Sequence, residues 1–234
     1  MTQIHEINKR VYSANKKIVK KGLVIQSFGN ASCRFKNLCI IKPSGVRMKK
    51  IGTEDMVSVE LDNSKSHSKL KPSSDTPTHL ELYKAYDQIN GIVHTHSIYA
   101  TSWAQSNKPI PCFGTTHADY WINEIPITDT LSDSYVKDQY EKNTGIAIIN
   151  KLKQLNYNPL DCPGILVANH GVFSWGKTIE EAVKHSELIE YIAYLAFNSL
   201  LISPELTKIS HSLQTKHFKR KHGPKSYYGQ SKNV

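Results

Sequence analysis

The order of the expected secondary-structure elements most constrains the fold of this chain. Two apolar stretches, at 22–35 and 37–45, are typical of strands, and the second ends in a Pro-Ser-Gly turn. Residues 164–175 alternate between strand and a turn at His170-Gly171. Strands and helices therefore follow one another without a strict βαβ alternation. This order predicts an α/β protein whose layers surround a partly antiparallel sheet.

Apolar periodicity predicts several helices between these strands. Residues 5–21 have the spacing of an amphipathic helix. A capping box from Thr178 to Glu181 opens a longer helix, which Pro204 ends. Residues 133–155 also suit a helix, with Tyr140 among the apolar positions that it carries.

Shorter segments are assigned from their turn chemistry. Thr76 is a candidate N-cap, and Pro77 suits the first position of the helix that follows. Residues 63–69, rich in serine and lysine, predict a surface loop. Residues 109–121 are expected to be short and extended.

Length and charge limit the classes of protein that fit. A chain of 234 residues with 39% hydrophobic residues can bury one substantial core, so we expect a single domain over 1–234. The net charge of +10 lies at the ends, because residues 1–21 contribute +5 and residues 206–234 contribute +7, which leaves −2 for the centre. Basic ends are typical of solvated helix faces or subunit contacts, so we expect no nucleic-acid partner. A basic nucleic-acid-binding protein is a third alternative, which a salt-dependent gel shift would test.

Cysteine usage and hydropathy point to the cytoplasm. The four cysteines form no C-x-x-C pair, which fits a reducing compartment. The N-terminal segment lacks the pattern of a secretory signal, and the longest apolar run, at 191–203, is too short to cross a bilayer. We therefore expect a cytoplasmic protein without a membrane partner.

Residues 91–96, GIVHTH, place two histidines at the end of a segment whose apolar residues predict a buried strand. Alternate side chains of a strand share a face, so His94 and His96 lie on the same side, about 7 Å apart along the strand. Neutral imidazole is a common zinc ligand. A pair of hydrogen-bonded core histidines is at least as common an explanation of this pattern.

Two further residues are candidates to complete a metal site. His170 follows a buried run and precedes Gly171, whose missing side chain would let an ion approach. Asp75 lies in a loop before a helix and is the best oxygen ligand. A histidine-glycine pair after a strand is usually only a turn.

Several polar clusters coincide with the expected strand ends. Gly29-Asn30, Ser44-Gly45 and Ser73-Ser74 can offer N–H groups and hydroxyls to a phosphate, and Lys42 adds positive charge. Each cluster alone is also ordinary turn chemistry.

Six blocks of sequence, taken together, resemble a known family. The blocks occur in the order GN…IKPSG, KPSSDTPTH, GIVHTHS, GTTHADY, HGVFSWGK and KHFKRKHGPKSYYGQ, over about residues 10–230. They resemble the L-ribulose-5-phosphate 4-epimerases of the class II aldolase/epimerase superfamily, to which the adducin head also belongs. The resemblance implies one three-layer αβα domain with a central, largely antiparallel sheet. The chain departs from the family at two places. Val172 replaces the proline of the family's usual His-Gly-Pro-Phe, and the loop around residues 33–37 is short.

The resemblance implies a set of site residues. One divalent cation per subunit, usually Zn²⁺ with Mn²⁺ or Co²⁺ as substitutes, would be held by Asp75, His94, His96 and His170. The substrate phosphate would be bound by Gly29, Asn30, Ser44, Gly45, Ser73 and Ser74, with Lys42 close by.

The resemblance also implies which residues act as catalytic acid and base. Asp119 and Tyr228 match the acid/base pair, and His217 would assist in binding the substrate. The family implies a homotetramer with active sites between subunits, to which the tail at 206–234 contributes.

The implied activity converts L-ribulose 5-phosphate into D-xylulose 5-phosphate by breaking and reforming the C3–C4 bond. The chain has no G-x-G-x-x-G after a strand, so nothing indicates a nicotinamide site. The alternative is a class II aldolase of the fuculose- or rhamnulose-phosphate type, whose members tend to carry glutamate where this chain has Asp75. A non-catalytic adducin-like module would be expected to lack ligands that are present here. The resemblance fits epimerases of arabinose and of ascorbate catabolism alike.

Overall fold

The computed structural model describes residues 3–66, 68–222 and 226–229. Residue 67 of the predicted surface loop, and residues 223–225 and 230–234 of the basic tail, lie outside the described residues. The strands are β1 Asn30–Phe35, β2 Leu38–Ile41, β3 Val57–Glu60, β4 Gly91–Thr95, β5 Gly164–Val167 and β6 Gly171–Gly176. The α-helices are α1 Gln3–Lys20, α2 Thr76–Ala85, α3 Ile98–Gln105, α4 Thr115–Ala118, α5 Asp133–Lys137, α6 Tyr140–Gln154, α7 Ile179–Ile202 and α8 His211–His222. Two 3₁₀ turns, Met48–Lys50 and Thr53–Asp55, precede β3.

The six strands form one antiparallel sheet in the order β3-β2-β1-β4-β6-β5. The strand β4 lies between β1 and β6, so His94 is paired with Asn30 on one side and with Phe173 on the other. Residues that are distant in the sequence therefore surround His94.

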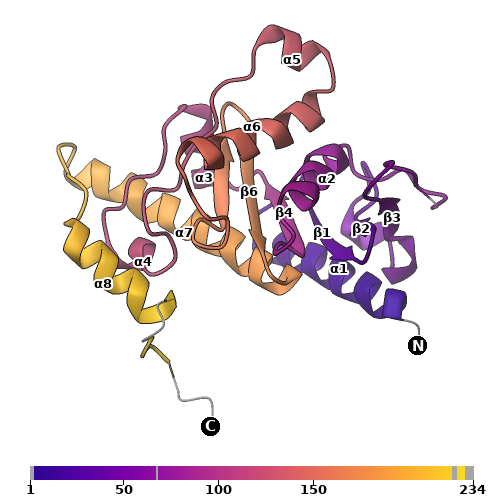
Figure 1. Cartoon of the computed structure of the whole chain (residues 1–234), viewed down its shortest axis with the longest axis horizontal. Coiled ribbons are helices and arrows are strands. Elements are labelled where there is room, and N and C mark those ends of the chain that lie inside the picture. Colours follow the sequence, from indigo (N-terminus) through magenta and orange to yellow (C-terminus); the bar gives the residue numbers. More distant parts are fainter. Residues whose placement is uncertain (1–2, 67, 223–225, 230–234) are drawn as a thin grey trace.

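Both faces of the sheet are covered, as the predicted three-layer fold requires. On one face, α1 and the start of α7 pack on side chains such as Ala31 and Val93. On the other face, α2, α3 and α6 enclose the larger core around Ile92 and Trp175. Figure 1 shows α1 and α7 on one side of the sheet and α2 and α6 on the other.

The long helix α7 begins as its sequence predicts. The Thr178 hydroxyl accepts the Glu181 N–H at 3.2 Å, which is the first half of the capping box. The Glu181 carboxylate accepts the N–H of Lys177 at 2.8 Å instead of that of Thr178. The cap therefore satisfies one N–H group of the first helical turn, that of Glu181, and one N–H group that precedes the helix, that of Lys177.

Four local predictions were wrong. The first strand begins at Asn30, because residues 22–29 turn with positive φ at Gly22, Gln26 and Gly29. The helix predicted over 133–155 is broken at Gln139, which is left-handed with φ 51°. Residues 115–118 are helical and not extended. The helix α2 begins at Thr76, so Asp75 and not Thr76 occupies the N-cap position, and the Thr76 hydroxyl donates to the Ser73 carbonyl at 2.6 Å.

Within the residues that the structure describes, the helices are all too short or too polar to span a bilayer.

Candidate active site

The histidines of GIVHTH converge on one point. His94 lies in β4 and His96 directly after it, and their Nε2 atoms are 3.0 Å apart. The Nδ1–H of buried His94 donates to the Val172 carbonyl at 2.9 Å, which leaves Nε2 as the atom that faces His96. The two rings therefore present nitrogens to a common centre, as the strand alternation predicts.

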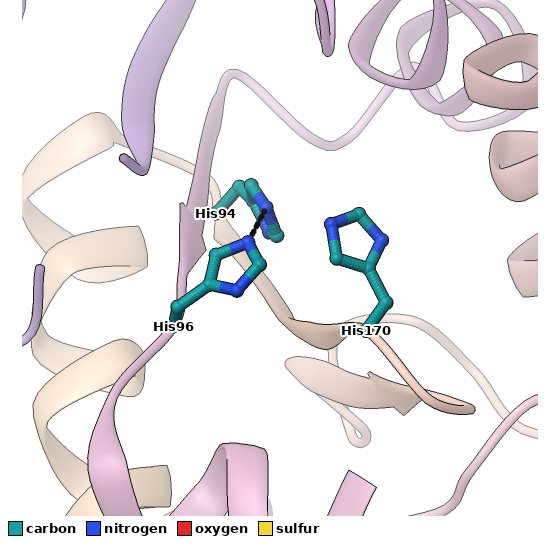
Figure 2. A group of neighbouring side chains, drawn as sticks. All are labelled: His94, His96 and His170. Atoms are coloured by element: carbon teal, nitrogen blue, oxygen red, sulfur yellow. Dashed lines mark hydrogen bonds between the residues drawn. The ribbon is translucent and has the colours of Figure 1, made fainter. Parts of the chain in front are cut away.

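His170 joins this pair from the turn between β5 and β6. Its ring centre lies 4.8 Å from that of His94 and 4.9 Å from that of His96. One nitrogen from each ring lies within 4.8 Å of the other two. Figure 2 shows the three rings pointing toward one another. We call this group the histidine cluster.

The histidine cluster has the chemistry of a metal centre. Burial, reinforced by the other imidazoles, lowers the pKa of His96 to about 4 and that of His170 to about 3. Both rings are therefore neutral at pH 7, the form in which imidazole binds metals. Three imidazoles with room for a further ligand match the donor set of a catalytic zinc site.

The missing side chain of Gly171 also has a role in strand packing. A Cβ there would lie 2.7 Å from the Thr95 carbonyl oxygen and 3.4 Å from the His94 ring. The glycine therefore lets β6 approach the end of β4 closely, and this approach places His170 beside the other two histidines.

Asp75 lies at the edge of the histidine cluster and outside the group of three. Its Oδ2 is 4.0 Å from Nε2 of His94 and accepts the Asn30 amide at 2.7 Å. Burial would raise the pKa of Asp75, but His94, the other nearby imidazoles and the Asn30 amide outweigh it and lower the pKa below its usual value. Although Asp75 is the N-cap residue of α2, its side chain makes no capping bond, so the carboxylate is oriented toward the site.

The predicted phosphate-binding residues gather in one cleft of about 380 Å³ beside the histidine cluster. Those that line it are Gly29, Asn30, Lys42, Ser44, Gly45, Ser73 and Ser74, together with Asp75, His94, His96 and His170. His217 does not line this cleft.

The turns around the cleft use part of their hydrogen-bonding capacity on each other. The N–H groups of Ser44 and Ser73 donate to the carbonyls of Lys71 and Lys42, both at 3.0 Å. A phosphate would therefore be bound by hydroxyls and by the other N–H groups of these turns, and not by all the amides that the sequence suggests.

Lys42 is held with its ammonium at the cleft. It is only 4% exposed, and Nζ donates to the carbonyls of Ser27 at 3.1 Å and of Pro43 at 3.3 Å. Burial lowers its pKa, an effect that Asp75 opposes. A buried cation with carbonyl partners is well placed to attract an anion.

Gly29 shapes the other wall of the cleft. Its φ is +73°, and a Cβ would lie 2.3 Å from Val24 Cγ1 and 2.9 Å from the His94 carbonyl oxygen. Only glycine fits this turn, which brings Asn30 to the start of β1 beside His94.

Four further residues, which the sequence does not predict, also line the cleft. They are Ser27, Phe28, Tyr140 and Glu141. Ser27 and Phe28 directly precede the Gly-Asn motif, so their nearness to it was the available signal. Tyr140 and Glu141 open α6 after the break at Gln139, and no sequence signal marks that break.

A second group of candidate catalytic residues lies around Asp119, at the end of α4. The Asp119 carboxylate accepts hydrogen bonds from Arg220 at 2.9 and 2.7 Å and from His217 at 3.0 Å. Lys221 Nζ lies 3.2 Å from the same carboxylate. Burial would raise the pKa of Asp119, but these three donors lower it below its usual value.

Tyr228 completes this group, which we call the Asp119 cluster. Its ring lies over Arg220, 4.8 Å from the guanidinium carbon, and 4.2 Å from Lys221 Nζ. The side chain is 59% exposed. None of the residues of this cluster lines the cleft of the same chain.

The chain belongs to the class II aldolase and adducin N-terminal domain family, whose sequence model matches residues 9–197. The match includes the whole histidine cluster and Asp119, and it ends before α8.

Solved structures have the same fold. An L-fuculose 1-phosphate aldolase is 23% identical with a TM-score of 0.76, over 94% of this chain and 98% of that one. An aldolase II superfamily protein from Pseudomonas syringae is 15% identical with a TM-score of 0.73, over 97% and 89%. An L-fuculose-1-phosphate aldolase from Thermus thermophilus is 18% identical with a TM-score of 0.68, over 85% and 97%.

Proposed function

We propose that this chain is a metal-dependent L-ribulose-5-phosphate 4-epimerase. The observation that carries the proposal is the convergence of His94, His96 and His170 at one side of a cleft whose lining also includes hydroxyls, an amide and Lys42. A ligand with an anionic end and adjacent oxygens matches both sides of this cleft.

The histidine cluster, with Asp75 at its edge, would hold a divalent cation, with zinc the metal that the donor set suits best. When bound, the cation supplies positive charge that stabilises the enediolate oxygens left by C3–C4 cleavage.

The cleft residues bind and orient the phosphate end of the substrate. Lys42 supplies the charge, and the hydroxyls of Ser44, Ser73 and Ser74 supply donors. This grip lets glycolaldehyde phosphate rotate without leaving the site. If the fragment were released, the net reaction would be the aldol cleavage that an aldolase catalyses.

Asp119 and Tyr228 are proposed as the acid/base pair. One group takes the proton from the C4 hydroxyl, the C3–C4 bond breaks, and its electrons pass to the C1–C3 fragment, which becomes an enediolate. After the aldehyde rotates, C3 attacks its opposite face, and the other group donates a proton to the new C4 oxygen. Two groups are needed because the oxygen lies on different sides before and after rotation.

The proposal requires a second copy of the chain, because the Asp119 cluster does not line the cleft of its own subunit. An exposed apolar surface on α7 offers a contact for such a copy. Its members on α7 are Tyr191, Tyr194, Phe197, Leu201 and Ile202. We propose a homotetramer with shared active sites.

A second candidate function is a class II sugar-phosphate aldolase. Its support is the matching fold of L-fuculose 1-phosphate aldolase along nearly the whole chain. The aspartate at position 75 and the Asp119 cluster favour the epimerase.

A coupled assay tests the proposal. With L-ribulose 5-phosphate and added zinc, the epimerase predicts D-xylulose 5-phosphate without free dihydroxyacetone. Accumulation of free dihydroxyacetone would favour the aldolase over the epimerase. If the chain turned over no sugar phosphate, both candidate functions would be excluded.

A further inference from the structure

Tyr140, the first residue of α6, contacts the histidine cluster directly. Its hydroxyl oxygen lies 3.2 Å from Nδ1 of His170, and its side chain lines the cleft. The sequence pattern assigned Tyr140 only to the apolar face of a helix. The structure gives it a polar contact that this assignment does not include.

The outer nitrogens of His94 and His170 have different partners. Nδ1–H of His94 donates to a backbone carbonyl, that of Val172. Nδ1 of His170 instead faces the Tyr140 side chain. In both rings this contact occupies Nδ1 and leaves Nε2 free to face the centre of the cluster. A metal-binding imidazole needs such an outer partner to fix its tautomer and orientation.

The backbone that carries Tyr140 is anchored by two hydroxyl groups. The Thr144 hydroxyl donates to the Tyr140 carbonyl at 2.9 Å, and the Thr78 hydroxyl donates to the next carbonyl, that of Glu141. Thr78 belongs to α2, which packs along α6 and begins directly after Asp75. The start of α6 is therefore attached to the helix that directly follows Asp75, and the Tyr140 hydroxyl contacts His170 from this side of the site.

We propose that Tyr140 is a positioning residue for the metal centre. Its hydroxyl oxygen accepts the Nδ1–H of His170, which keeps the Nε2 lone pair directed at the cation. This inference rests on the proposed function, because it assumes that the histidine cluster binds a metal ion.

The test is the zinc affinity of Tyr140→Phe, measured by competition with a chromophoric chelator. Loss of an outer partner typically weakens metal binding by about 10- to 100-fold. We expect a loss of that size, a changed visible spectrum of the Co²⁺-substituted variant, and substantial recovery of kcat at saturating zinc. The matched control is Tyr135→Phe, because Tyr135 is 58% exposed on α5, and it should bind zinc like the wild type. The thermal unfolding temperature of the metal-free Tyr140→Phe should match that of the control.

Two results separate this inference from the proposed function. Zinc binding by Tyr140→Phe as tight as in the wild type overturns the role of Tyr140 and leaves the metal centre intact. A wild-type chain that binds no zinc overturns both. If Tyr140→Phe does not fold, nitrogen-15 NMR of the zinc-loaded wild type decides, because the inference requires the His170 proton on Nδ1, and a proton on Nε2 contradicts it.

Discussion

Arg220 binds Asp119 through two parallel hydrogen bonds, from Nε to Oδ1 at 2.9 Å and from Nη2 to Oδ2 at 2.7 Å. The same guanidinium lies under the ring of Tyr228, and the Arg220 carbonyl accepts the N–H of Tyr228 at 3.2 Å. One residue of α8 therefore connects the two members of the proposed acid/base pair, which are far apart in the sequence.

This relationship predicts a change in the pH profile of Arg220→Met. Arg220 is among the donors that lower the pKa of Asp119. Without it, the pKa of Asp119 rises, so the carboxylate becomes protonated at a higher pH. The acid limb of kcat/KM should therefore move to higher pH, and Arg220→Lys should move it less because it keeps the charge. An acid limb at the wild-type position in both variants would show that Asp119 does not act as a base.

Tyr228→Phe should lower kcat by about 10²-fold, a typical loss for an acid/base group. The hydroxyl lies on a side chain that is 59% exposed, so its removal should leave folding and zinc content unchanged. Steady-state kinetics and elemental analysis of the same preparation provide the two measurements. An unchanged kcat would remove Tyr228 from the mechanism.

Shared active sites predict that two inactive variants restore activity when they assemble together. His96→Asn keeps its own Asp119 cluster, and Tyr228→Phe keeps its own histidine cluster. After reassembly of an equal mixture, about one quarter of the sites in a cyclic tetramer would combine two intact halves. Activity near that fraction of the wild type is expected. Activity no higher than that of the separate variants would place the whole site within one subunit.

The pH dependence of stability should include a contribution from His117. Burial lowers its pKa to about 4, although its Nε2–H donates to the Asn123 carbonyl at 2.9 Å. Between pH 6.5 and about 4 the unfolded chain binds this proton and the folded chain does not. The contribution is thus complete above pH 6.5 and is lost as the pH falls, by about 1.4 kcal/mol per pH unit for one proton.

His117→Gln removes this titration and keeps a side-chain N–H. Urea unfolding at pH 7.5 and at pH 5.0 should show a smaller loss of unfolding free energy in the variant than in the wild type. The other histidines contribute equally to both proteins and cancel in the comparison. Equal losses would mean that His117 is not protonated differently in the folded and unfolded chains.

Local patterns in the sequence predict part of the fold and of the cleft, and the family resemblance supplies the three-layer arrangement and the full set of site residues. Strand alternation places His94 and His96 on one face, and the turn residues at strand ends identify the positions that line the cleft. The strand β3 was not predicted, although its buried residues, Val57 and Val59, alternate with less buried ones.

The remaining features depend on contacts between distant segments. The positive φ of Gln26 and Gln139 has no marker in the residue type, so the late start of β1 and the break before α6 were not predicted. Tyr140 meets His170 only because that break turns the chain, and Arg220 meets Asp119 only because α8 packs against α4. Neither pairing has a local pattern from which it could be predicted.

The zinc content of His96→Asn tests the central claim most directly, since that claim assigns one divalent cation to the histidine cluster. Elemental analysis should find about one zinc ion per chain in the wild type and almost none in the variant. The control His211→Asn changes an exposed histidine of α8 and should keep the wild-type content. A full complement of zinc in His96→Asn would contradict the account.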